Sequence, residues 1–227
     1  MPGLAWPIEL RSHPRARSLR LRLDEARELL VLTVPRRMSR RAVLQWAERQ
    51  SQWVETQLSR IQPGEPLTPG AFIPLQGREV RLGWNEALPR LPVLAGDVLQ
   101  CGGPIEAFPT RIERYLRAEA RRILGETTLE MAHKAGVTVS AVSVGDARSR
   151  WGSCSSTGAI RYNWRIALAP PHLLRWLVAH EVAHRRHMNH GPEFRTLEAE
   201  LYGGSVHAAR AELKALGPRL KRVGRAI

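Results

Sequence analysis

The chain has 227 residues, 43% of them hydrophobic and 25% charged, with a formal net charge of +14. That composition is typical of an ordinary globular protein, and the length allows a sizeable core without a disulfide or metal staple. Two cysteines, Cys101 and Cys154, are too few for a disulfide framework. The positive charge favours polyanionic partners such as nucleic acid or nucleotides, although charge alone identifies no partner.

The N-terminal segment MPGLAWPIELRSHPRARS lacks the uninterrupted apolar stretch of a signal peptide. No later run approaches the length of a transmembrane helix. We therefore expect a cytoplasmic protein with no membrane partner.

The first part of the chain is predicted to be rich in strands. Short strands are expected within residues 8–34, where apolar residues alternate, and again within residues 71–101. Between them, Ser39 is a plausible N-cap for one long helix through roughly Ile61. Residues 1–105 are thus predicted to form a strand-rich N-terminal region with one long helix.

Residues 106–227 are predicted to form a second domain. A helix is expected from Thr110 to about Ala135, where Gly136 fits a C-terminal stop. Strands are expected at residues 137–145 and 159–168, and Pro170 and Pro171 open the next helix. At least one more helix follows residue 192. Strands and helices segregate rather than alternate, which predicts an α+β fold.

The second of these helices carries an HExxH motif, His180-Glu181-Val182-Ala183-His184. Residues four positions apart share one helix face, so the His180 and His184 imidazoles can reach a single ion. Glu181 can then take a proton from the water that the metal activates. Zn²⁺ is the expected metal, since neutral imidazole suits it and an open coordination position activates water. Among the apolar residues of this helix, unpartnered polar groups would be costly, and a metal supplies the partners.

The predicted third ligand is His190. It stands ten positions after His180, the offset of the last histidine in the HExxHxxGxxH pattern, although His187 replaces the glycine of that pattern. Residues 189–192 can form the turn that brings His190 back. His187 is the rival, but on a continuous helix it lies about 10.5 Å along the axis from His180, at about 1.5 Å per residue. Two downstream carboxylates are less favoured alternatives: Glu198 and Glu200.

The segment RSRWGSCSSTGAIRYNWRIALAPPHLLRWLVAHEVAHRRHMNHGPEF resembles the signature of the YgjP-like zinc metallopeptidases, relatives of the SprT-like and WLM proteases. The specific part of the resemblance covers residues 148–194, and a looser similarity extends over most of the chain. It implies zinc ligands at His180, His184 and His190, a catalytic Glu181, and a zincin-like domain in which the HExxH helix packs on a small antiparallel sheet. The usual aromatic residue after Phe194 is Arg195 here.

Several residues near the motif have weaker functional interpretations. Cys154 is expected to be a buried small thiol rather than a nucleophile or ligand. Trp151 and Trp164 are expected in the core or the cleft wall. Residues 160–164 are predicted to be a strand at the cleft edge to which an extended peptide could pair. Tyr162 in that strand is a candidate for stabilising an oxyanion, although alternation alone does not fix its direction.

Six arginines cluster in sequence around the motif, and each taken alone is expected to be solvated. Together they could steer an anionic substrate toward the metal. They are Arg148, Arg150, Arg161, Arg165, Arg185 and Arg186.

The leading hypothesis is therefore a zinc metallopeptidase that acts on a peptide or protein substrate. One alternative is a metal-dependent nucleoside triphosphate pyrophosphatase, in which arginines hold the phosphates, although the chain has no P-loop and no carboxylate cluster for magnesium. The other is a nucleic-acid-associated protease or binding module that uses the basic surface. An intact motif glutamate argues against a purely structural metal site, and the sequence leaves the oligomeric state open.

Overall fold

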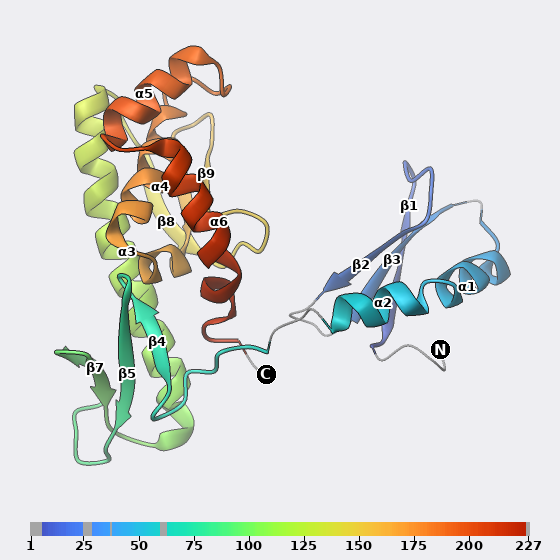
Figure 1. The fold of residues 1–227 in the computed structure, drawn as a ribbon, viewed down its shortest axis with the longest axis horizontal. Helices are drawn as coiled ribbons and strands as arrows, with labels where there is room; N and C mark the ends of the chain where they lie inside the picture. Colours follow the sequence, from blue (N-terminus) through green and yellow to red (C-terminus); the bar gives the residue numbers. More distant parts are fainter. Residues whose placement is uncertain (1–5, 25–28, 37, 60–62, 226–227) are drawn as a thin grey trace. The chain divides into compact units, whose positions relative to one another are not determined.

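The computed structural model describes residues 6–24, 29–36, 38–59 and 63–225 (Figure 1). The chain forms two compact units, Met1–Pro63 and Gly64–Ile227. Each unit has strands, helices and a hydrophobic core of its own, so the α+β class is confirmed. Among the described residues, no helix combines the length and apolarity needed to cross a bilayer.

The N-terminal unit is a three-stranded sheet with two short helices. The strands are β1 (Ile8–His13), β2 (Arg20–Asp24) and β3 (Leu29–Pro35), in the order β1-β3-β2, and the helices are α1 (Arg40–Glu48) and α2 (Ser51–Leu58). Ser39 caps α1 as predicted, since its side chain accepts a hydrogen bond from Ala42 N. The single long helix predicted here is instead divided at residues 49–50, and its predicted end at Ile61 lies outside the described residues.

The C-terminal unit begins with a four-stranded sheet. Its strands are β4 (Phe72–Leu75), β5 (Arg78–Trp84), β6 (Val93–Ala95) and β7 (Val98–Cys101), in the order β4-β5-β7-β6. The buried side chains of this sheet, such as Ile73 and Leu99, belong to the same core cluster as Phe108 and Ile112 of the following helix. The compact units therefore divide at residues 63 and 64, whereas the sequence placed a boundary near residue 105.

A short 3₁₀ turn, η1 (Ile105–Ala107), leads into the long helix α3 (Phe108–Ala135). The helix ends as predicted at Gly136, which has φ 63°, a left-handed conformation that glycine adopts without strain. Its buried face includes Leu116, Leu124 and Met131 and supports the elements that follow.

The second sheet of the C-terminal unit is mixed, whereas a small antiparallel sheet was expected here. It contains β8 (Ala141–Gly145), β9 (Gly152–Cys154) and β10 (Ala159–Asn163), in the order β8-β10-β9. The hairpin of β9 and β10 is antiparallel, while β8 runs parallel to β10 on its other side. The second predicted strand ends at Asn163 because its side chain accepts a hydrogen bond from Arg165 N and starts the 3₁₀ helix η2 (Trp164–Leu168).

Three helices complete the unit: α4 (Pro171–Ala183), α5 (Pro192–Tyr202) and α6 (Val206–Arg222). Helix α4 starts at Pro171, as predicted, and contacts α3, α5, α6 and β9 (Figure 1). Most of its side chains are buried, including Leu173, Leu177 and Val178. The helix that carries the HExxH motif is thus held on several sides.

Candidate metal centre

Three histidine side chains converge at the C-terminal end of α4. His180, His184 and His190 each offer a ring nitrogen, and these three atoms all lie within 4.8 Å of one another. The Nε2 atoms of His180 and His190 are 3.4 Å apart. Two nitrogens bound to one tetrahedral zinc, each at about 2.1 Å from it, would also be separated by about 3.4 Å. The donor set therefore fits zinc in both chemistry and spacing.

Local structure explains how the three rings meet. His180 lies in the last turn of α4 and His184 caps its C-terminus, so the four-residue spacing stacks them on one face. The chain then turns and presents His190 just before α5. Phe194, in the first turn of α5 and only 1% exposed, packs against all three rings, with centroid distances of 5.1 Å to His180 and 4.7 Å to both His184 and His190.

The other nitrogens of two of these rings are held by protein acceptors. His180 Nδ1 donates to Glu198 Oε1 at 3.0 Å, and His184 Nδ1 donates to the carbonyl oxygen of His187 at 3.2 Å. Such bonds fix the ring tautomer and leave Nε2 available to a metal. Burial also lowers the pKa of His184, with a smaller contribution from the nearby His180, and this favours the neutral form that binds metal.

The rival ligands lie outside the cluster. His187 faces Glu193, with Nδ1 3.4 Å from Oε2, and its backbone orients His184 instead. Glu198 is 1% exposed and its Oε1 also accepts a hydrogen bond from Trp176 Nε1 at 2.9 Å. Glu200 is exposed on the same helix. Glu198 is therefore a partner of His180, a role that the sequence analysis missed.

Glu181 lies at the interface between α4 and β9 and is 4% exposed. Desolvation raises the pKa of its carboxyl to about 7, while the charges of His180 and Arg150 act in the opposite direction. A carboxyl group with a pKa near neutrality is suited to both accept and donate a proton. The Glu181 carboxyl fits against β9 because residue 152 is glycine. A Cβ at this position would overlap Glu181 Oε1.

Two predictions about the neighbouring strand are wrong. β10 is the central strand of its sheet, so no edge is free for a peptide to pair with it; the edge strand beside Glu181 is β9. Tyr162 is 1% exposed and its hydroxyl lies 3.0 Å from Thr128 Oγ1, inside the core. A buried hydroxyl that is already paired is not exposed to a substrate.

The two tryptophans and the cysteine considered in the sequence analysis serve mainly as packing groups. Trp164 is fully buried and the half-buried Trp151 packs against the same core, both as expected. Lys221 Nζ lies 5.0 Å from the centre of the Trp151 ring. Cys154 is half-buried rather than buried. Burial is the main cause that raises the pKa of its thiol, so the protonated form is favoured over the nucleophilic thiolate.

The six arginines that cluster in sequence around the motif divide into two groups. Arg165 is 2% exposed, pairs with Asp146 and donates from Nε to the carbonyl of Val223 at 2.7 Å. Arg185 donates to the carbonyls of Thr138 and Ser156. The side chains of these two arginines are engaged in structural contacts. The other four are exposed at the surface: Arg148, Arg150, Arg161 and Arg186.

A pocket of about 320 Å³ opens beside the histidines. Its lining comes from α4, α5, α6 and the turn before α5: Trp176, His180, His190, Phe194, Arg195, Glu198 and Arg210. Trp176 precedes His180 by four residues, and Phe194 precedes Glu198 by four. This spacing places each pair on one helix face, and it was the only indication in the sequence that these residues line a common pocket.

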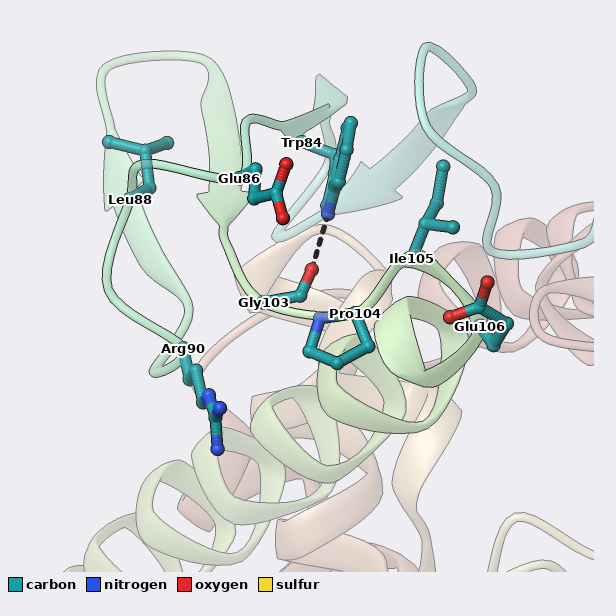
Figure 2. Close-up of a pocket in the computed structure, with 8 residues that line it drawn as sticks. All are labelled: Trp84, Glu86, Leu88, Arg90, Gly103, Pro104, Ile105 and Glu106. Atoms are coloured by element: carbon teal, nitrogen blue, oxygen red, sulfur yellow. Dashed lines mark hydrogen bonds between the residues drawn. The ribbon is translucent and has the colours of Figure 1, made fainter.

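A second hollow of about 600 Å³ lies between the end of β5 and the start of α3 (Figure 2). Trp84 forms one wall, and its Nε1 donates to the carbonyl of Gly103 at 2.9 Å. The lining includes the carboxylates of Glu86 and Glu106 but no histidine or cysteine. The pocket beside the three histidines is therefore the better candidate for a zinc-dependent site.

Comparison with known protein families gives one match. The family model described as "YgjP-like, metallopeptidase domain" matches residues 17–216 and so spans most of both compact units. It includes the three histidines and Glu181. No curated protein matches the chain in sequence.

Proposed function

The chain belongs to the YgjP-like metallopeptidase family, and from that premise we propose that it is a zinc-dependent hydrolase of peptide bonds. The observation that carries the proposal is the convergence of three imidazole nitrogens within 4.8 Å, next in sequence to Glu181, whose buried carboxyl interacts electrostatically with His180. Under this proposal His180, His184 and His190 are the zinc ligands. Bound zinc would supply a Lewis acid for the carbonyl and the attacking water.

The proposed roles of the protein groups follow from their surroundings. Glu181 takes the proton of the attacking water and passes it to the leaving amine, which requires a carboxyl that titrates near neutrality. Glu198 holds the His180 ring in the orientation that keeps Nε2 directed at the other two histidines. β9 is an edge strand whose Gly152 packs against Glu181, so its unpaired backbone groups are candidates for pairing with an extended substrate.

The alternatives gain less support. For nucleotide hydrolysis, two of the six arginines expected to hold phosphates, Arg165 and Arg185, are already bonded within the protein. A nucleic-acid-associated role rests on the net charge of +14 and on the resemblance to SprT-like proteases. A nucleotide hydrolase would release phosphate or pyrophosphate from nucleoside triphosphates, which separates it from a peptidase in one assay.

The decisive experiment compares the wild type with Glu181→Gln. The variant keeps the size of the side chain but not the base, so we expect full zinc content and a loss of peptide cleavage of about 10²-fold or more. Zinc is measured by mass spectrometry and cleavage on a peptide library. Glu200→Gln, an exposed carboxylate on α5, serves as the matched control and should cleave like the wild type. Substantial cleavage by Glu181→Gln would overturn the assignment.

A further inference from the structure

Two guanidinium groups line the pocket beside the three histidines. Arg195 extends from α5 and Arg210 from α6. In the part of the chain that the structure describes, neither forms an ion pair with a carboxylate. Other arginines of the same unit are paired: Arg117, Arg122, Arg165, Arg175, Arg219 and Arg222.

The carboxylate inside the pocket does not satisfy these arginines. Glu198 Oε1 already accepts from Trp176 Nε1 and from His180 Nδ1. Arg210 influences Glu198 electrostatically, and its guanidinium carbon lies 6.0 Å from the centre of the Trp176 ring. The pocket therefore presents two positive charges whose hydrogen-bond donors remain available to a ligand. Planar guanidinium groups bind carboxylates with two parallel hydrogen bonds.

The other walls restrict what can enter. Trp176 and Phe194 provide aromatic surface, and the volume of about 320 Å³ is at the small end for ligand pockets. Such a space suits one side chain or a chain end with an apolar stem. Because His180 and His190 also line it, a group bound there lies next to the proposed zinc ligands.

We propose that this pocket is a specificity site that binds a carboxylate of the peptide substrate next to the scissile bond, held by Arg195 and Arg210. The inference rests on the proposed peptidase function and names its substrate class. The carboxylate comes either from an aspartate or glutamate side chain or from the C-terminus of the substrate. Both sources share the same chemistry, and suitable peptides distinguish them.

A binding experiment tests the proposal without requiring turnover. The zinc-loaded Glu181→Gln protein is titrated with short capped alanine peptides that contain a central Glu, Gln or Lys, and with an alanine peptide that has a free C-terminus. We expect one of the two carboxylate-bearing peptides to bind about 10- to 100-fold more tightly than the Gln peptide, since hydrogen bonds to charged groups are the strong ones. Which peptide gains identifies the source of the carboxylate.

Arg195→Ala and Arg210→Ala, added singly and together, should abolish that preference and leave zinc content unchanged. Arg121→Ala removes an exposed arginine of α3 outside the pocket lining and should keep the preference. Equal affinity for all four peptides, or a preference that survives the double substitution, overturns the proposal. Failure of the peptidase function itself appears separately, as the absence of cleavage by the wild type.

Discussion

His190 and His187 are close in sequence, yet only His190 brings a ring nitrogen to the other two histidines. We expect His190→Ala to lower zinc content from about one ion per chain to well below it, because a catalytic zinc site needs three protein ligands. His187→Ala should retain zinc, since its side chain faces Glu193 and only its backbone touches the site. Mass spectrometry of both proteins, purified without added metal, checks this. Equal loss in the two variants would contradict the ligand assignment.

At this scale the sequence predicted which three histidines lie together but not the residues that support their rings. The offset of ten residues from His180 favoured His190, and the structure brings those rings together. The bond between Glu198 and His180 depends on how α5 docks against α4, which local spacing does not encode. For the same reason, the orientation of Tyr162 into the core was not predictable from strand alternation.

At the scale of elements, the close approach of β9 to α4 has a functional consequence. Gly152→Ala would place a methyl group against Glu181 Oε1 and force the carboxyl or the strand to move. We expect a loss of peptide cleavage of about 10- to 100-fold, because displacements of about 1 Å can cost that much in catalysis, with zinc content preserved. Kinetic assays together with metal analysis measure both effects.

A glycine with free space around it provides the control. Gly125 lies within α3, and a Cβ added there meets no atom within 4 Å. Gly125→Ala should therefore leave cleavage unchanged. An equal effect of the two substitutions would show that Gly152 has no special relation to the site.

Helices were predicted more accurately than the ends of strands. α3 and α4 follow strong signals, namely a long apolar periodicity closed by Gly136 and a proline at the first position. Two elements were predicted too long. The helix after Ser39 is interrupted at residues 49–50, and the strand at residue 159 ends when the Asn163 side chain caps η2. Residues 164–168 are compatible with a strand or a helix. The hydrogen bond from Arg165 N to the Asn163 side chain favours the helix and ends the strand.

At the scale of the whole molecule, the C-terminal unit holds the complete candidate site and its own core. The start of this unit is fastened to α6, because Glu65 pairs with Arg222 and Arg219. We therefore expect a fragment of residues 64–227 to unfold cooperatively and to bind zinc like the full chain. Thermal melting followed by circular dichroism, with metal analysis, checks both.

A fragment of residues 106–227 is the matched comparison, since it begins at the boundary that the sequence suggested. It lacks β4–β7 and would expose the side chains of Phe108 and Ile112, which are fully buried in the chain. We expect it to aggregate or to melt at a lower temperature. Equal stability of the two fragments would restore the boundary near residue 105. Composition could not locate the boundary between residues 63 and 64. It depends on the packing of strands β4–β7 against α3, which appears only in the folded structure.

The short connection between α4 and α5 also has a thermodynamic meaning. An ion held by His180, His184 and His190 would act as a reversible cross-link between the end of one helix and the beginning of the next. Ion binding and the docking of α5 would then be linked, and each would stabilise the other by the same free energy. At an ion concentration about 100 times the dissociation constant, an ion that binds only when α5 is docked would stabilise the docked form by about 2.7 kcal/mol. The concentration of free metal ion around the protein would thus determine how stably α5 is docked against α4.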